Sequence, residues 1–299
     1  LHSRDATLPN NYLPNSMAKQ FTWGEAVDYT LKTKWAGKAG LKTNKINTGH
    51  FTEFAGRSFP VDRINQIQMD LFTAHLRETR DLSNATINRC ITAIGTVMNC
   101  CAKRDMCNPA PVFDKHDEGE KRMFWFTQDQ VEDMCLAALD PYARDEIADI
   151  IVTAAYTGIR QGELLKLKAQ DIDLGQQRIH VGGVPHLNTK AKNYRSIPIH
   201  PRIKDVFRKR LEHASPSVKV FDDVGNKDQL LLAFKKVRDY AQAPAYTFHD
   251  LRHSFGTWHA IAGTPMRTLM GLMGHKRIET TLDYSKHTDK AAEAAMAAI

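Results

Sequence analysis

The chain has 299 residues, with 41 lysines and arginines against 34 acidic residues and a formal charge of +7. Hydrophobic residues make up 42% and charged residues 25% of the sequence, a composition that excludes a disordered chain. No apolar run approaches the roughly 18 residues of a membrane span, so no membrane partner is expected. The length favours two domains, and the basic excess favours a polyanionic partner.

The cysteines and the first residues indicate the compartment. The five cysteines are odd in number and contain no CxxC pair, which supports neither a disulfide framework nor a zinc ribbon. They are interpreted as reduced thiols. Leu1 to Lys19 contain no apolar stretch of the kind found in secretory signals. A cytoplasmic protein is therefore expected.

The first part of the chain predicts a small all-α domain over residues 19–107, preceded by a tail at 1–18. The fourth helix has the clearest pattern, because an N-cap serine precedes a long apolar stripe at helical spacing. Residues 108–123 contain two prolines and many charged side chains, which favours an exposed linker. The four helices are expected to start at Thr22, at about 43, near Ile64 and at Ser83.

Residues 124–288 predict a second domain of mixed type. A capping box formed by Thr127 and Gln130 opens it. Two short strands are expected, at Arg178–Val181 and Tyr194–Ile199. The Ala-rich end, residues 289–299, favours a short helical tail. Helices are expected at about 128–139, 143–156, 201–213, 227–242, 249–262, 265–273 and 278–286.

Four polar segments of the second domain suit phosphate chemistry. Arg160 follows a helix break, and Glu163 stands three residues further on, where it can orient the guanidinium. His249 and Arg252 share one face of the first turn of a predicted helix, where backbone N–H groups favour an anion. Taken alone, Arg160 and Glu163 are also compatible with a surface ion pair, and His249 and Arg252 with a helix that places the histidine in the core and the arginine in solvent.

The other two segments supply His275, which follows a helix C-terminus, and Tyr284, nine residues later. Together with the two arginines they form a chemical set. Guanidinium groups bind phosphate oxygens and offset charge that develops at phosphorus. A histidine can move a proton, and a phenol can form a covalent ester that preserves the bond energy for rejoining.

On these residues the chain resembles the tyrosine recombinases of the phage integrase family. The resemblance covers about residues 125–286, and the helical region 19–107 is similar, with a less specific match, to the family's core-binding domain. It implies a SAM-like helical bundle and a mainly helical α/β catalytic domain with a small antiparallel sheet. The matching stretches are TGIRQGELLKL (157–167), NTKAKNYRSIPI (188–199), HDLRHSFGTW (249–258) and LMGHKRIETTLDYSK (272–286).

The resemblance implies a role for each matching residue. Arg160 and Arg252 match the arginines that clamp the scissile phosphate. His249 and His275 match the two histidines of the family's active site. Tyr284 matches the nucleophile, which forms a 3′-phosphotyrosine link and releases a 5′-hydroxyl.

Two further positions follow from the same match. Glu163 corresponds to an acidic support for Arg160. Lys190, eight residues before Pro198, corresponds to the hairpin lysine that acts as general acid for the leaving oxygen. Lys192 is the rival for this position, because a hairpin register two residues away presents the same face.

The implied activity is site-specific recombination of two double-stranded attachment sites by a homotetramer, through a Holliday junction and without a metal or other cofactor. Phage or mobile-element DNA is the favoured substrate, in the cytoplasm and nucleoid of a bacterial host, with accessory DNA-bending and directionality proteins as further partners. The tail at 289–299 would contact a neighbouring protomer. An arm-binding domain, if there is one, would precede Leu1.

Three other functions stay open on the sequence. A DNA-binding protein without catalysis is disfavoured by the complete residue set. A type IB topoisomerase shares the chemistry, but the amino-acid sequences of the matching motifs and the small helical domain favour an integrase. A metal hydrolase would use four histidines, but no HExxH motif or carboxylate set accompanies them. Those histidines are His249, His253, His259 and His275.

Overall fold

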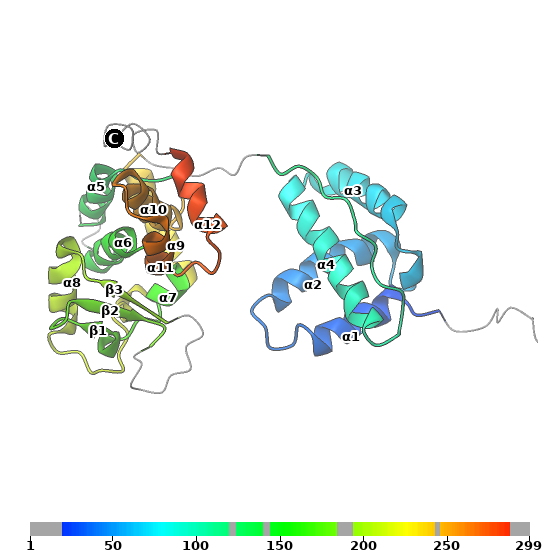
Figure 1. Cartoon of the computed structure of the whole chain (residues 1–299), viewed down its shortest axis with the longest axis horizontal. Coiled ribbons are helices and arrows are strands. Elements are labelled where there is room, and N and C mark those ends of the chain that lie inside the picture. The colour runs from blue at the N-terminus through cyan, green and yellow to red at the C-terminus, as the bar shows by residue number, and fades with distance from the viewer. Residues whose placement is uncertain (1–19, 120–123, 140–143, 184–193, 243–245, 288–299) are drawn as a thin grey trace, which may run out of the picture. The chain divides into compact units, whose positions relative to one another are not determined.

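The structure, a computed structural model of the chain, describes residues 20–119, 124–139, 144–183, 194–242 and 246–287 (Figure 1). The chain divides into two compact units, Leu1–Lys121 and Arg122–Ile299. In the described ranges no helix is both long enough and apolar enough to cross a membrane. The predicted tails at 1–18 and 289–299 lie outside these ranges.

The first unit is a helical bundle built around its longest helix, which packs against the other three. A capping box at Thr22 and Glu25 starts the first helix, and the Ser83 side chain caps the fourth. Phe51 is fully buried and meets the rings of Trp23 and Phe72 edge-on at 5.0 and 5.2 Å. The helices are α1 (Trp23–Thr33), α2 (Leu41–Ala55), α3 (Gln66–Arg80) and α4 (Asn84–Ala102), with a 3-10 turn at Val61–Arg63.

The segment after α4, where an exposed linker over 108–123 is predicted, is attached to the first unit by a few specific contacts. Phe113 is buried in the core of the first unit. Asn88 Nδ2 donates to the His116 carbonyl at 2.8 Å, and the His116 N–H donates to Asn88 Oδ1 at 2.9 Å. Most of residues 108–119 are exposed, as predicted, but these contacts dock the segment on the bundle, which the sequence did not predict. A single buried ring and hydrogen bonds between a side chain and the backbone produce no periodic hydrophobic pattern in a polar sequence, so the sequence does not reveal them.

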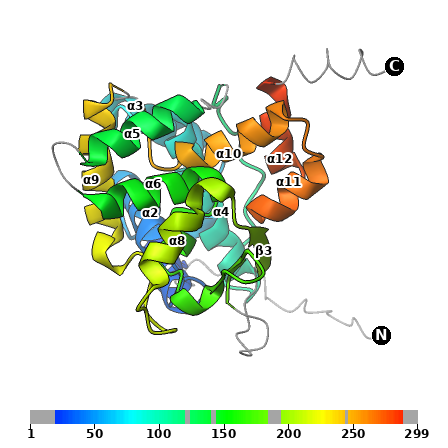
Figure 2. The ribbon, with the colours of Figure 1, turned by 90° about the vertical axis from the view of Figure 1, so that its left-hand side faces the viewer.

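The second unit surrounds α6 (Asp145–Thr157), which packs against α5 (Gln128–Leu139), α8 (Pro201–Leu211), α9 (Lys227–Tyr240) and α10 (Asp250–Ile261). Figure 2 shows α5, α6 and α8 side by side. Most of α6 is buried, which explains why its sequence is apolar on nearly every face.

A small sheet lies beside these helices. Its strands β1 (Ile172–Asp173), β2 (Arg178–Val181) and β3 (Arg195–Pro198) are antiparallel in the order β1-β2-β3. Ile179 of β2 pairs with Ile172 and Ile197, and all three point into the core. The predicted mixed class and small antiparallel sheet are confirmed.

Three elements at the end of the chain complete the unit and carry part of the site. They are α11 (Met266–Met273), α12 (Glu279–Leu282) and a 3-10 turn at Asp283–His287. The sequence predicted one helix over 278–286, whereas the structure divides it. It also did not predict α7 (Gln161–Leu164) or β1, because four and two residues are too few to show a period.

Candidate active site

Arg252 lies in the first turn of α10 and is 3% exposed. Its guanidinium donates to the carbonyls of Gly158 and, at 2.7 Å, Met273. Gly158 ends α6 at φ +62, and a Cβ there would lie 2.5 Å from the ring of Phe255. Burial, and then the charge of Arg160, lower the pKa of Arg252 to about 10. The group therefore stays cationic at neutral pH.

Arg160 is the N-cap of α7, and 39% of its side chain is exposed. Its Nη2 donates to the Gly274 carbonyl at 3.0 Å, and its Nη1 to Glu163 Oε1 at 3.3 Å. The Arg160 backbone N–H donates to the other carboxylate oxygen at 3.2 Å. These hydrogen bonds hold the guanidinium in place on its protein side. Part of the side chain still faces solvent, as an anion-binding group requires.

The Glu163 carboxylate also binds Arg195, the first residue of β3. Arg195 Nη2 donates to Oε2 at 2.8 Å, and Arg195 Nη1 to Oε1 at 3.3 Å. Burial by itself would raise the pKa of Glu163, but the hydrogen bond and charge of Arg195, followed by those of Arg160, lower it below its usual value. Glu163 is therefore ionised and shared between two arginines.

The end of α11 gathers all three guanidinium groups. The successive carbonyl oxygens of residues 272–274 accept hydrogen bonds from Arg195 at 2.9 Å, Arg252 at 2.7 Å and Arg160 at 3.0 Å. The last carbonyls of a helix lack partners within it and carry the negative end of its dipole. This helix end therefore sets the spacing of the cations.

Tyr284 is 3% exposed in the 3-10 turn after α12. Its hydroxyl forms a 3.0 Å hydrogen bond with His253 Nδ1, in which the donor depends on the histidine tautomer. Its ring is parallel to that of His275, with centroids 6.3 Å apart. Burial raises the pKa of Tyr284 to about 12, although the charges of Arg252 and Arg160 act in the opposite direction.

Two further histidines lie near the arginines. Burial, and then the charge of Arg252, lower the pKa of His275 to about 4, and its Nδ1 is 2.9 Å from Thr281 Oγ1. His249 meets the ring of His253 edge-on at 4.9 Å. Desolvation by the surrounding protein, and then His253, lower its pKa to about 4, although the residue is exposed at the surface. Both rings are neutral at pH 7.

Comparison with known proteins decides the family. The model of the phage integrase family matches residues 125–291. The chain belongs to this family. It is 25% identical over 282 residues to the tyrosine recombinase XerC of Staphylococcus aureus, covering 83% of this chain and 90% of that protein. It is 28% identical over 218 residues to the integrase of Escherichia phage P2, covering 70% and 57%.

Solved structures show that the integrase fold extends over both units. The Tn1549 transposon integrase, in complex with a circular intermediate DNA, has a TM-score of 0.75 at 20% identity, with 94% of this chain and 100% of that chain covered. A lambda integrase dimer bound to a core site has a TM-score of 0.67 at 13% identity, with 89% and 95% covered. By sequence, the chain spans 57% to 61% of relatives such as the P2 integrase and the XerA recombinase of Thermococcus kodakarensis.

Most of the residues singled out in the sequence of this integrase-family chain lie in one place. Their contacts link α7, α10, the end of α11 and the final 3-10 turn. Lys190 and Lys192 lie outside the described residues. The residues that meet are Arg160, Glu163, His249, Arg252, His275 and Tyr284.

Sequence reasoning missed two residues of this site. Arg195 is 8% exposed, and the alternation of β3 directs it inward with Ile197. An arginine on the apolar face of a strand is a signal that it has a buried anionic partner. In the sequence His253 stands out only as a possible metal ligand, whereas in the structure it contacts the phenol of Tyr284. Within the described ranges no group of three or more His, Cys, Asp or Glu side chains is arranged to hold a metal.

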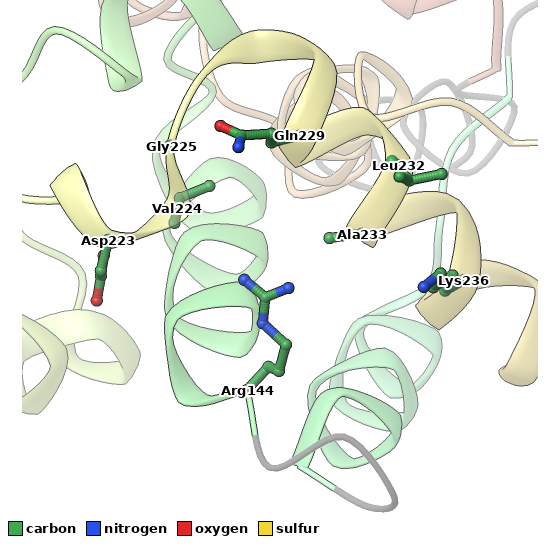
Figure 3. A pocket seen from close by; sticks show the side chains of 8 residues that line it. All are labelled: Arg144, Asp223, Val224, Gly225, Gln229, Leu232, Ala233 and Lys236. Carbon is green, nitrogen blue, oxygen red and sulfur yellow. The ribbon is translucent and has the colours of Figure 1, made fainter.

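A separate hollow lies beside α9 (Figure 3). It has a volume of about 230 Å³, and Arg144 points into it toward α9. None of the residues of the candidate active site lines it. Its lining residues are Arg144, Asp223, Val224, Gly225, Gln229, Leu232, Ala233 and Lys236.

Proposed function

We propose that this integrase-family chain is a site-specific DNA recombinase that cleaves and rejoins DNA through a phosphotyrosine intermediate. The observation that carries the proposal is the buried phenol of Tyr284, which is hydrogen-bonded to His253 and parallel to the ring of His275, in the site where the end of α11 holds Arg160 and Arg252, whose charges act on the phenol. A phenol in such a field suits attack on a phosphodiester and has no need of water or a cofactor.

In the proposed reaction, Arg160 and Arg252 bind the non-bridging oxygens of the scissile phosphate. The carbonyls at the end of α11 already hold both guanidiniums, so little reorganisation precedes the reaction. As the phosphorane forms, its extra negative charge lies against two cations, one of them almost fully buried. Charge stabilisation of this kind is usually the largest contribution to catalysis.

The phenol of Tyr284 must lose its proton, because a pKa of about 12 leaves it protonated at neutral pH. Burial lowers the pKa of His253, so this ring is neutral and its Nδ1, 3.0 Å from the hydroxyl, can accept the proton. The phenol oxygen then bonds to phosphorus and the bond to the 5′-oxygen breaks. We assign the proton delivered to that oxygen to Lys190, with Lys192 as the alternative.

His249 and His275 are proposed to hydrogen-bond the phosphate. Both are neutral in the free protein, and a bound phosphate would raise their pKa values because an opposite charge favours the protonated ring. Rejoining reverses the steps: the 5′-hydroxyl of the partner strand attacks the phosphotyrosine, and Tyr284 recovers its proton.

Double-stranded DNA is the partner that the relatives support. The Tn1549 integrase was solved with a circular intermediate DNA and the lambda integrase with a core site. We propose that the helical unit clamps the duplex while the second unit cuts it. The same proposal includes assembly into a tetramer, in which residues 289–299 contact a neighbouring protomer. It also includes help from accessory DNA-bending and directionality proteins. The reaction would take place in the cytoplasm and nucleoid of a bacterial host.

A plasmid assay tests this function. Duplexes that bind the chain are selected from a randomised library, and two copies of the selected core are placed on one supercoiled plasmid with EDTA present. Wild-type protein should yield deletion or inversion products, whereas Tyr284→Phe should bind the plasmid and yield none. Relaxation without recombinants would instead indicate a topoisomerase, and no reaction at all would contradict the proposal.

A further inference from the structure

A third arginine at the site, Arg195, has no role in the chemistry described above. It starts β3, and 7% of its side chain is exposed. All three nitrogens of its guanidinium donate hydrogen bonds: two to the carboxylate of Glu163 and one to the carbonyl of Leu272. A buried cation this fully bonded is costly to remove and rigid when present.

We propose that Arg195 is a positioning residue, which occupies the carboxylate of Glu163 and thereby leaves the guanidinium of Arg160 available to the scissile phosphate. The inference rests on the proposed function and deepens it. Arg195 acts through its neighbours and is not assigned a contact with DNA.

The hydrogen-bond lengths around Glu163 support this division of labour. Arg195 Nη2 lies 2.8 Å from Oε2, whereas Arg160 Nη1 lies 3.3 Å from Oε1. The buried Arg195 contacts the carboxylate through two nitrogens, at 2.8 and 3.3 Å, whereas the side chain of Arg160, 39% exposed, makes a single bond of 3.3 Å to it. Without Arg195, the carboxylate would be left to pair with Arg160, in direct competition with the negative phosphate.

The same side chain also ties β3 to the end of α11. Arg195 Nε donates to the Leu272 carbonyl at 2.9 Å, immediately before the two carbonyls that hold the other arginines. Gly274 is at φ +64, and a Cβ there would lie 2.9 Å from Arg195 Nη1. The fit is close, so a change at Arg195 alters the helix end whose carbonyls hold Arg160 and Arg252.

The direct test replaces Arg195 with Met, which keeps an unbranched apolar stem as far as the position of Nε and removes the guanidinium charge. The probe is a nicked suicide duplex carrying the core selected by binding, at saturating protein, with the rate of covalent adduct formation measured. We expect a loss of about 100-fold for Arg195→Met, as for a catalytic group misplaced by about 1 Å. DNA affinity should change little, and Arg195→Lys should recover part of the rate.

The chain offers a matched control in Arg210 of α8. Its side chain is 10% exposed and pairs with Asp149 at 2.8 Å and Asp223 at 3.0 Å, outside the candidate active site. Arg210→Met should lower the melting temperature, as removal of a buried paired cation does, but leave the adduct rate of the folded protein unchanged.

A double-mutant cycle with Glu163→Gln separates positioning from simple packing. If Arg195 works by occupying the Glu163 carboxylate, then Arg195→Met should cost less than about tenfold once that charge is gone, since coupled residues are not additive. An equal loss in both backgrounds would overturn the proposal. Should Arg195→Met not fold, Arg195→Lys takes its place in the cycle, because lysine lacks the bidentate fork.

The two proposals fail in different ways. If wild-type protein forms no adduct on the selected duplex, the recombinase function itself fails. If wild-type protein forms the adduct and Arg195→Met forms it at the same rate, the function stands and the role of Arg195 is refuted.

Discussion

Gly256→Ala probes how closely the ring of Tyr284, the proposed nucleophile, packs against α10. Gly256 lies in α10, and a Cβ there would come 2.6 Å from Cε1 and Cζ of Tyr284 and 2.9 Å from Cδ1. The ring is rigid and 3% exposed, so it cannot yield as a flexible side chain would. Overpacking of this kind costs about 1–3 kcal/mol, partly offset by the roughly 1 kcal/mol by which alanine is favoured over glycine in a helix.

Two measurements follow from this estimate. Urea denaturation should show Gly256→Ala to be neutral or destabilising by up to about 2 kcal/mol, the difference between the overpacking cost and the helix preference. In the Tyr284→Ala background the clash is gone, and the same substitution should stabilise by up to about 1 kcal/mol. Adduct formation by Gly256→Ala should fall about 100-fold, because the phenol is displaced.

Gly271 supplies the control for this prediction. It is also helical, in α11, but a Cβ there would meet nothing within 4 Å. Gly271→Ala should therefore be neutral or stabilising in every background. If Gly256→Ala had the same effect on stability with and without the Tyr284 ring, the close packing of Tyr284 against Gly256 would be refuted.

Further predictions follow from the hydrogen bonds and the pKa values. Tyr284→Phe loses the hydrogen bond to His253 and should cost about 0.5–1.5 kcal/mol of stability by urea denaturation. The folded pKa values of His249 and His275, about 4, lie below the ordinary 6.5, so the unfolded chain takes up protons first. The free energy of unfolding should therefore fall as the pH drops from about 6.5 to 4. His275→Gln should reduce this dependence on pH. An equal dependence in the variant and the wild type would contradict the role of His275. Burial raises the pKa of Cys135 to about 12, so native protein at pH 8 should leave this thiol unlabelled by a disulfide reagent that reaches it in urea.

The sequence predicted the helices well where burial and periodicity coincide. In α4, Ser83 caps the start, and the predicted stripe of buried residues continues to Cys101. A long amphipathic helix repeats its signal over several turns, so local errors cancel. The segment carrying Tyr284 has one turn of α-helix and one of 3-10 helix, and so no comparable repeat.

The candidate site was predicted in part, for a physical reason. Arg160 follows the helix break at Gly158, and Arg252 and Tyr284 stand in short motifs, HDLRHSFGTW and LMGHKRIETTLDYSK, that match the family locally. Arg195 stands in a four-residue strand, and its partners are 32 and 77 residues away in the chain. Contacts at such separations depend on the tertiary fold, which no local pattern encodes.

The segment after α4, residues 108–119, makes contacts with the bundle that the sequence did not predict. Its prolines and charges are typical of an exposed linker, and most of its side chains are indeed exposed. One buried ring, Phe113, and the bonds between Asn88 and the His116 backbone hold it on the bundle. Composition reports the average exposure of a segment, whereas docking depends on a few specific contacts.

The most direct test of the account is to capture and map the covalent intermediate. A nicked suicide duplex with the selected core is incubated with the full chain in EDTA, denatured and digested, and the DNA-linked peptide is sequenced by mass spectrometry. The account predicts a denaturation-resistant adduct in which a 3′-phosphate is joined to Tyr284, absent from Tyr284→Phe. An adduct on another residue, an adduct formed by Tyr284→Phe, or none with wild-type protein on DNA that it binds would contradict it.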